Sequence, residues 1–311
     1  MGFGHSHDHH HHLEQAGDDS ADSAAGIRAV KISLVVLGVT AVAQLLVVMV
    51  SGSVALFADT VHNFSDALTA VPLWIAFAMG TRTATQRYTY GFGRVEDLAG
   101  LFVVLAIAAS AVIAAIEAVR RFFEPVPLAH LGWVAMAGVV GFVGNEVVAV
   151  YRIRVGRRIG SAALEADGMH ARTDGLTSLG VVAGAGGVAL GFPMADPIVG
   201  LLIACAIGFV MVVAARDVFA RLLDGVDPTM IATAQDVLSG RPGVLEVRRV
   251  RMRWVGHRLE ADVELDVAPT LNLQDAHRVA HDAEHALAHA IPKLATVIVH
   301  AYPAHDRALS S

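Results

Sequence analysis

The sequence has one cysteine, few aromatic residues and few charges. Cys205 is the only cysteine among 311 residues, which excludes a disulfide scaffold and a thiolate-rich zinc finger. Charged residues make up 17% of the chain, and hydrophobic residues make up 55%. Because soluble domains carry about 25% charged residues, a soluble enzyme is not expected. The net charge of −6 argues against a nucleic-acid partner.

Long hydrophobic stretches take the place of the missing charges. A bilayer core about 30 Å thick needs roughly 20 apolar residues in each helix that crosses it. We expect six transmembrane helices, near Ile27–Val50, Val54–Gly80, Val95–Val119, Leu128–Val150, Ala162–Leu190 and Pro197–Ala215. The membrane domain is therefore predicted over residues 27–220, after a polar, His-rich and disordered leader over residues 1–26.

Basic residues predict how these helices are oriented. The N-terminal flank and the exits of the second, fourth and sixth helices carry Arg28, Lys31, Arg82, Arg87, Arg94, Arg152, Arg154, Arg157, Arg158, Arg216 and Arg221. The opposite loops carry Arg120 and Arg121 alone. By the positive-inside rule, both termini are cytoplasmic. We expect a multi-pass protein of the plasma (inner) membrane.

A second domain follows the last predicted span. Helical patterns cover Pro228–Leu238 and Leu273–Ala290, and alternating patterns typical of strands cover Val244–Trp254, His257–Val267 and Ala295–Tyr302. The order αββαβ predicts a small α+β domain of ferredoxin-like type over residues 221–305, followed by a short tail over 306–311. This domain is too short for an enzyme with a deep cleft, and it suits dimerisation or sensing.

One polar motif occurs in both the second and the fifth predicted helix. Residues 55–69 and 163–177 share Ala, Leu, Ala, Asp, His, Asp, Leu and Thr at matching positions. The two copies lie three spans apart, so they run in opposite directions through the membrane. Inverted repeats of this kind occur in transporters, and the substrate site lies where the two halves meet.

Each copy places a histidine four residues before an aspartate, on one face of its helix. The pairs are His62 with Asp66 and His170 with Asp174. Two imidazoles and two carboxylates fit tetrahedral Zn²⁺ or Co²⁺, whereas oxygen ligands alone suit Mn²⁺ or Mg²⁺ better. The alternative is hydrogen bonding between helices without metal. Ionisable groups are costly inside a bilayer, which favours a metal site.

The same four ligands suggest a driving force for transport. Histidine must be neutral and aspartate ionised to hold a cation, so protons compete with the metal for these groups. A site that faces alternate sides of the membrane would then exchange metal for protons. The alternatives are a membrane metal sensor without flux and a metalloenzyme. An enzyme is disfavoured because His-Glu-x-x-His is absent and four protein ligands leave no open position.

These features resemble the cation diffusion facilitator family of zinc and cobalt exporters. The resemblance rests on the six spans, the paired motif, the Tyr90–Glu96 segment before the third span and the αββαβ tail. This sequence has histidine rather than aspartate at position 62, and in this it resembles the zinc-type branch of the family. The family implies a homodimer that exports Zn²⁺, with Co²⁺ or Cd²⁺ as further substrates, in exchange for protons. Ni²⁺, Mn²⁺ or Fe²⁺ is the alternative, and no prosthetic group is expected.

The resemblance also predicts an ion pair and indicates that one metal site of the family is absent. A basic residue before the third helix and an acidic residue after the sixth pair in the family, and here they are Arg94 and Asp224. They form a charge interlock at the cytoplasmic neck of the dimer, or they are independent surface charges. A second metal site between helices 2 and 3 is not expected, because its positions hold Thr85, Tyr88 and Phe92.

Histidines in the C-terminal domain suggest a regulatory metal site. The family resemblance supports a site near Glu264, His277 and His300. Relatives with a fuller site carry a histidine and an acid where this sequence has Arg248 and Tyr302. His277 also starts a stripe with His281, His285 and His289, each four residues apart, and solvated histidines are the alternative there.

Overall fold

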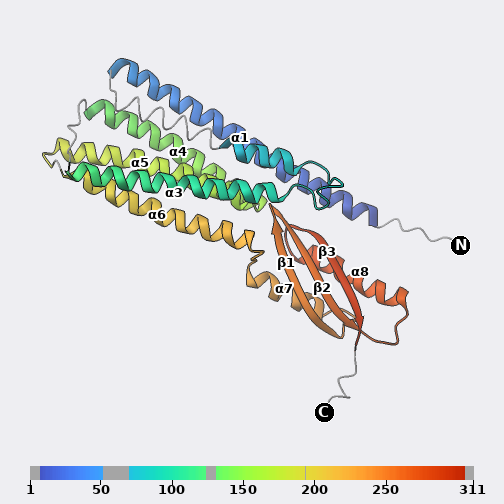
Figure 1. Ribbon diagram of the computed structural model, residues 1–311. Helices are drawn as coiled ribbons and strands as arrows, with labels where there is room; N and C mark the ends of the chain where they lie inside the picture. Colours follow the sequence, from blue (N-terminus) through green and yellow to red (C-terminus); the bar gives the residue numbers. More distant parts are fainter. Residues whose placement is uncertain (1–7, 52–69, 124–130, 193, 305–311) are drawn as a thin grey trace, which may run out of the picture. The chain divides into compact units, whose positions relative to one another are not determined.

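A computed structural model describes residues 8–51, 70–123, 131–192 and 194–304 (Figure 1). The chain divides into two compact units, a helical unit over Ala16–Phe219 and a smaller unit that contains the chain from Ala220 onward. Each unit has its own hydrophobic core.

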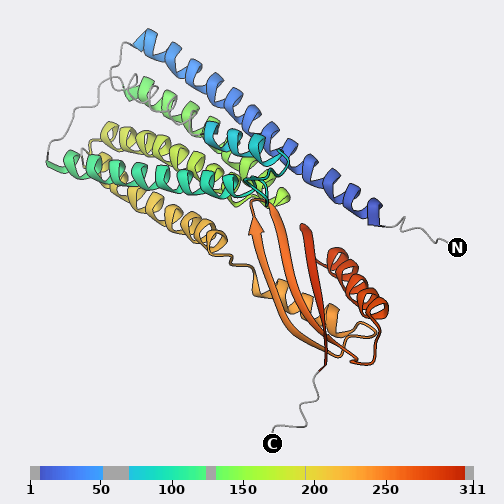
Figure 2. The same cartoon turned by 45° about the vertical axis from the view of Figure 1, so that its right-hand side comes forward.

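Long helices lie side by side in the helical unit (Figures 1 and 2). They are α1 (Asp8–Ser51), a shorter helix Ala70–Gly80, α3 (Arg94–Phe123), α4 (Leu131–Ile159), α5 (Ala162–Ala189) and α6 (Ala195–Leu222). Four stretches are long and apolar enough to cross a membrane, namely Ser20–Leu46, Arg94–Phe123, Gly132–Ile159 and Ala195–Leu222. The first, third, fourth and sixth predicted spans are therefore confirmed as apolar helices of the required length.

The second and fifth predicted spans differ from these four. Only Ala70–Gly80 of the second span lies within the described residues, and this part is helical. The fifth span is present as α5, which has the predicted length but is not among the four stretches that are apolar enough to cross a membrane. This helix carries the second copy of the repeated motif, so its polar side chains are the ones expected to have a function.

Several helices of the helical unit extend beyond their predicted ends. α1 begins at Asp8, so its first turns include most of the leader, residues 1–26, for which the sequence predicts disorder. α4 and α6 continue past the predicted ends, Val150 and Ala215. Extending an existing helix costs little because each added residue forms one further backbone hydrogen bond. Hydropathy predicts only the part of a helix that is apolar, and therefore misses these extensions.

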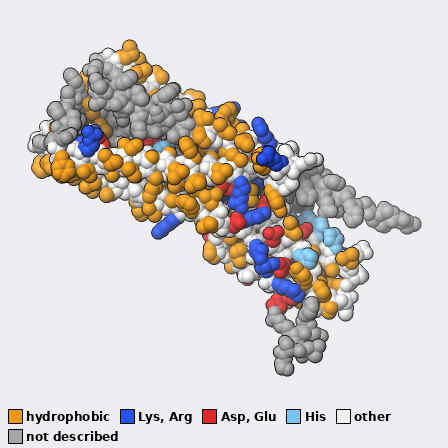
Figure 3. Space-filling view, in the orientation of Figure 1, with side chains coloured by type: hydrophobic (Ala, Val, Ile, Leu, Met, Phe, Trp, Pro, Cys, Tyr) orange, Lys and Arg blue, Asp and Glu red, His pale blue; other side chains and the backbone are white. Residues whose placement is uncertain are grey.

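Apolar side chains cover much of the face of the helical unit that the space-filling view shows (Figure 3). Exposed large residues on α3 and α6 include Leu105, Ile113, Leu202 and Phe209. An apolar surface of this extent is unfavourable in water and suits contact with lipid.

The smaller unit has the predicted order αββαβ. It contains α7 (Pro228–Ser239), β1 (Glu246–Val255), β2 (Arg258–Val267), α8 (Leu273–Ala290) and β3 (Leu294–Pro303). The sheet order is β1-β2-β3, with β1 antiparallel and β3 parallel to β2. Gly256, at a φ of 62°, provides the left-handed turn between β1 and β2.

Two helices cover one face of this sheet. Ala261, Val263 and Leu265 of β2 form a buried core with Ala283 and Leu287 of α8, and α7 adds further apolar residues. The residues that alternate with them on β2 lie on the other face. The two sheet faces therefore have different chemistry, which decides where polar residues of this domain can meet.

Asp227 caps the first helix of the smaller unit. Its carboxylate accepts a hydrogen bond of 2.9 Å from the backbone N–H of Thr229 and one of 2.7 Å from the Thr229 hydroxyl. Both bonds favour the ionised form and lower the pKa of Asp227.

We expect Asp227→Ala to lower the Tm of a fragment spanning residues 220–311 at neutral pH. The folded pKa is depressed, so the stabilisation is present above the unfolded pKa, about 3.9, and is lost as the pH falls through the folded pKa. Thermal unfolding at several pH values should show the two proteins converging in acid. Asp236→Ala, which removes an exposed carboxylate from the same helix, is the control. A Tm difference for Asp227→Ala that is independent of pH contradicts this account.

Candidate functional site

Helix α5 carries a buried polar stripe through the helical unit. The helix begins after Ser161, whose hydroxyl accepts a hydrogen bond of 3.1 Å from the backbone N–H of Leu164. Asp167, His170 and Asp174 follow at intervals of three and four residues, and all three are buried. Three buried ionisable groups in a membrane-type bundle require partners or a ligand.

His170 and Asp174 lie one helical turn apart, as predicted. The Nδ1 atom of His170 is 3.8 Å from Oδ1 of Asp174, and the two side chains are 3% and 6% exposed. An imidazole nitrogen and a carboxylate oxygen are thus available together inside the bundle. They form half of the predicted set of four ligands.

The other half of that set, His62 and Asp66, lies outside the described residues. The joining of the two pairs stays a prediction. Within the described ranges, no group of three or more His, Cys, Asp and Glu side chains could hold a metal ion.

Asp167 is held by an arginine of α4. The Nη1 atom of Arg152 lies 2.8 Å from Oδ2 of Asp167, and the two side chains are 2% and 0% exposed. The helices can approach closely here because residue 168 is glycine, where a Cβ atom would lie 2.7 Å from Ile153 and 3.1 Å from the carbonyl oxygen of Ala149. The sequence pattern did not reveal this pair, because Arg152 is one of several arginines near the end of α4.

Arg172 makes a second ion pair between the same two helices. It donates hydrogen bonds of 3.1 and 2.7 Å to the two carboxylate oxygens of Glu146 on α4. Its side chain is 39% exposed, whereas that of His170 is 3% exposed. As its position two residues after His170 predicts, Arg172 does not share the buried stripe.

The predicted residues of the regulatory site lie on different sides of the smaller sheet. Glu264 on β2 is paired with His300 on β3, on the face that the helices leave open. His277 belongs to α8, which covers the opposite face. Glu264 forms an ion pair with Arg249 of β1. The geometry of one chain therefore gives no support to a site made from these three residues, and the site stays a prediction.

The histidine stripe on α8 is held in part by ring contacts. The rings of His281 and His285 stack with centroids 4.6 Å apart, and those of His277 and His281 meet edge to face at 6.2 Å. On the open face of the sheet, the ring of His300 lies 4.3 Å from that of Tyr302.

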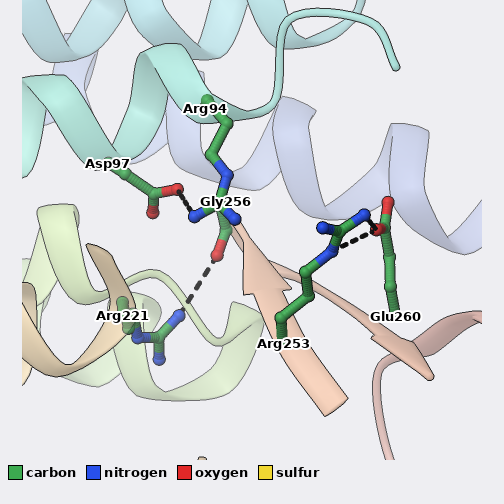
Figure 4. A network of polar contacts seen from close by, with 6 residues as sticks. All are labelled: Arg94, Asp97, Arg221, Arg253, Gly256 and Glu260. Atoms are coloured by element: carbon green, nitrogen blue, oxygen red, sulfur yellow. Dashed lines mark hydrogen bonds and ion pairs between the residues drawn. The ribbon is translucent and has the colours of Figure 1, made fainter. Parts of the chain in front are cut away.

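The two members of the predicted charge interlock belong to different units. Within the helical unit, the guanidinium of Arg94 lies 3.5 Å from the carboxylate of Asp97 (Figure 4). Asp224 belongs to the smaller unit and has a φ of 58°. Their pairing stays a prediction.

The smaller unit has a hydrogen bond and an ion pair of its own near the turn between β1 and β2. Arg221 donates a hydrogen bond of 3.1 Å to the carbonyl oxygen of Gly256 (Figure 4). Arg253 donates one of 3.0 Å to Glu260, and this bond raises the pKa of Arg253.

Residues at the positions of the second metal site contact one another. The backbone N–H of Tyr88 donates to the Thr85 hydroxyl at 3.1 Å, and the rings of Tyr88 and Phe92 lie 5.0 Å apart. The expectation that these residues hold no metal stays a prediction.

Comparison with known proteins identifies both units. Residues 30–223 match the cation efflux transmembrane domain, and residues 226–304 match the cytoplasmic domain of cation efflux proteins. Together they define a membrane transporter with a cytoplasmic domain. The chain belongs to the cation efflux, or cation diffusion facilitator, family.

Individual relatives extend over most of the chain. A probable cation efflux system protein of Mycobacterium tuberculosis is 67% identical over 301 residues, which cover 96% of this chain and 90% of that protein. The magnetosome protein MamB of Magnetospirillum gryphiswaldense is 26% identical and covers 82% of this chain and 86% of its own. A solved variant of the MamM CTD is 22% identical, covers 25% of this chain and 93% of its own, and has a TM-score of 0.25.

We expect the buried pair between α4 and α5 to be essential for stability. Asp167→Ala leaves the Arg152 charge buried without its partner, which should lower the free energy of unfolding by about 3–5 kcal/mol. Thermal unfolding in detergent provides the measurement.

Glu165→Ala is the matched control for this prediction. It removes the ion pair that Glu165 makes with Arg157 at 3.2 Å, where the arginine side chain is 71% exposed, so the expected loss is under about 1 kcal/mol. Equal losses in the two variants would show that burial of the Asp167 pair has no energetic consequence.

Proposed function

We propose that this protein exports divalent transition-metal cations from the cytoplasm in exchange for protons. The observation that carries the proposal is the buried pair of His170 and Asp174 on α5, with 3.8 Å between Nδ1 and Oδ1. The same spacing recurs at His62 and Asp66. The four side chains are proposed to hold one cation between the second and fifth spans.

The proposed ligand set favours Zn²⁺, with Co²⁺ and Cd²⁺ as further substrates. Two imidazole nitrogens and two carboxylate oxygens satisfy a tetrahedral ion of intermediate softness. Manganese is the second candidate, because a relative in Bacillus subtilis that is 26% identical is named a manganese efflux system protein. Mn²⁺ prefers oxygen ligands, so the histidines favour zinc over manganese.

Charge balance in the apolar bundle supports coupling to protons. Two ionised carboxylates and one dipositive ion give a site without net charge. When the metal leaves, two negative charges stay buried, which is costly in a membrane. Protons that bind to the carboxylates or imidazoles remove this cost and also prevent the metal from binding again.

The distribution of arginine supports an orientation with both termini in the cytoplasm. α4 ends with Arg157 and Arg158, and α6 ends with Arg221, whereas Arg120 and Arg121 lie at the opposite end of α3. We propose that the protein lies in the plasma (inner) membrane. By the positive-inside rule, its arginine-rich end then faces the cytoplasm. We also propose a homodimer, in which Arg94 and Asp224 form the charge interlock.

Asp174→Asn is expected to abolish transport of Zn²⁺, because the amide cannot supply the negative charge that balances the cation. Zinc flux into proteoliposomes provides the measurement, with Co²⁺, Cd²⁺ and Mn²⁺ tested in parallel. Asp217→Asn, which changes an exposed aspartate of α6, should retain flux. Undiminished flux in Asp174→Asn would overturn the assignment of the site.

A proton gradient is expected to drive zinc movement through the wild-type protein. In proteoliposomes, zinc entering the lumen should be accompanied by protons leaving it, detected with an internal pH indicator. An imposed gradient that is acidic inside should accelerate zinc entry. Zinc flux of the same rate with and without the gradient, and without proton release, contradicts antiport.

A further inference from the structure

A cleft opens in the helical unit between α3, α5 and α6. Its volume is about 110 Å³, and a single water needs roughly 10–15 Å³ of such space. The polar side chains in its lining are those of Glu117 and Arg121 of α3, Thr177 of α5 and Asp196 of α6, and the other lining residues are apolar or glycine. The cleft therefore has room for several waters, or for an ion with part of its hydration shell.

The cleft continues the face of α5 that carries His170 and Asp174, the proposed metal-binding pair. Ala163, His170, Asp174 and Thr177 are separated by seven, four and three residues, which places them on one face of the helix. This face meets α3 at Ala163, because a Cβ atom added to Gly100 of α3 would lie 3.2 Å from the Cβ of Ala163. Thr177, one turn beyond Asp174, lines the cleft.

An ion pair joins two helices at this cleft, toward the arginine-poor end. Arg121 of α3 donates a hydrogen bond of 2.8 Å to Asp196 of α6 and one of 3.2 Å to Glu117 of its own helix. The side chains of Arg121 and Asp196 are 33% and 16% exposed. Residue 184 of α5 is glycine, and a Cβ atom there would lie 2.6 Å from Oδ1 of Asp196. The Asp196 carboxylate can therefore occupy this position only because Gly184 has no side chain.

We propose that the cleft is the outward path of the transported cation and that the Arg121–Asp196 ion pair is its outer lock. This inference rests on the proposed export function. The carboxylates of Glu117 and Asp196 attract a cation that leaves Asp174, and the tethered guanidinium of Arg121 neutralises them while the path is closed. A partly exposed ion pair is weak enough to open and close repeatedly.

A cysteine at Thr177 tests the path. In a Cys205→Ser background, the Thr177→Cys protein is reconstituted and treated with a membrane-impermeant thiol reagent from the arginine-poor side. We expect labelling, and loss of most of the zinc flux after labelling. Leu179→Cys is the matched control, because Leu179 is on the same helix and 41% exposed but does not line the cleft. Its flux should survive treatment.

Neutralising one arginine tests the lock. Arg121→Gln in the Thr177→Cys protein should increase the labelling rate about fivefold, as expected for the loss of one partly exposed ion pair. Arg120→Gln removes the same charge from the neighbouring residue and should leave the rate unchanged.

The outcomes separate this inference from the export function. Absence of zinc flux in the unlabelled Cys205→Ser protein contradicts export, whereas the labelling rates still report on the cleft. Normal zinc flux after complete labelling of Thr177→Cys, or no labelling at all, overturns the path. Equal labelling rates in Arg121→Gln and Arg120→Gln overturn the lock.

Discussion

The cost of burying charge among apolar helices governs the arrangement of this protein. α3 and α6 present large apolar residues outward. Charged groups inside such a bundle must therefore form ion pairs or bind a ligand. Asp167 is paired with Arg152 of α4 at 2.8 Å. His170 and Asp174, on the same stripe of α5, supply a nitrogen and an oxygen ligand within 3.8 Å of each other. One helix thus combines a structural charge pair with the proposed ligands of a transported cation.

Pairing of α4 with α5 determines how the ligand helix is placed. Gly168 lets the backbones approach, the Arg152–Asp167 pair fixes the buried side of α5, and the Arg172–Glu146 pair joins the same helices at a more exposed position. These contacts orient α5 before any metal binds. The positions of the proposed ligand pair and of the cleft at Thr177 both follow from this one orientation of α5.

Much of this could be predicted from residue patterns, because apolar length and period-two alternation are local properties. Four of the apolar spans, α5 and the order αββαβ were predictable, as was the spacing of His170 and Asp174 by one helical turn. The partner of Asp167 was not, since several arginines lie near the end of α4 and only helix packing selects Arg152. The cleft likewise depends on three helices that are distant in sequence.

The predicted regulatory site shows that residues of one small domain do not all meet in space. Sequence places Glu264, His277 and His300 in one small domain, but sheet pairing and helix packing put His277 on the element that covers the other sheet face. Alternation along β2 determines this separation, and it becomes visible only once the helices are known to cover the face with Val263 and Leu265.

The claim that one cation is held by both copies of the motif can be tested most directly by X-ray absorption at the zinc edge. In protein lacking residues 1–25, the account predicts four nitrogen and oxygen neighbours at about 2.0–2.2 Å, two of them imidazoles. His62→Ala and His170→Ala should each remove one imidazole from the zinc environment. A zinc environment that is unchanged by either substitution would contradict the shared site.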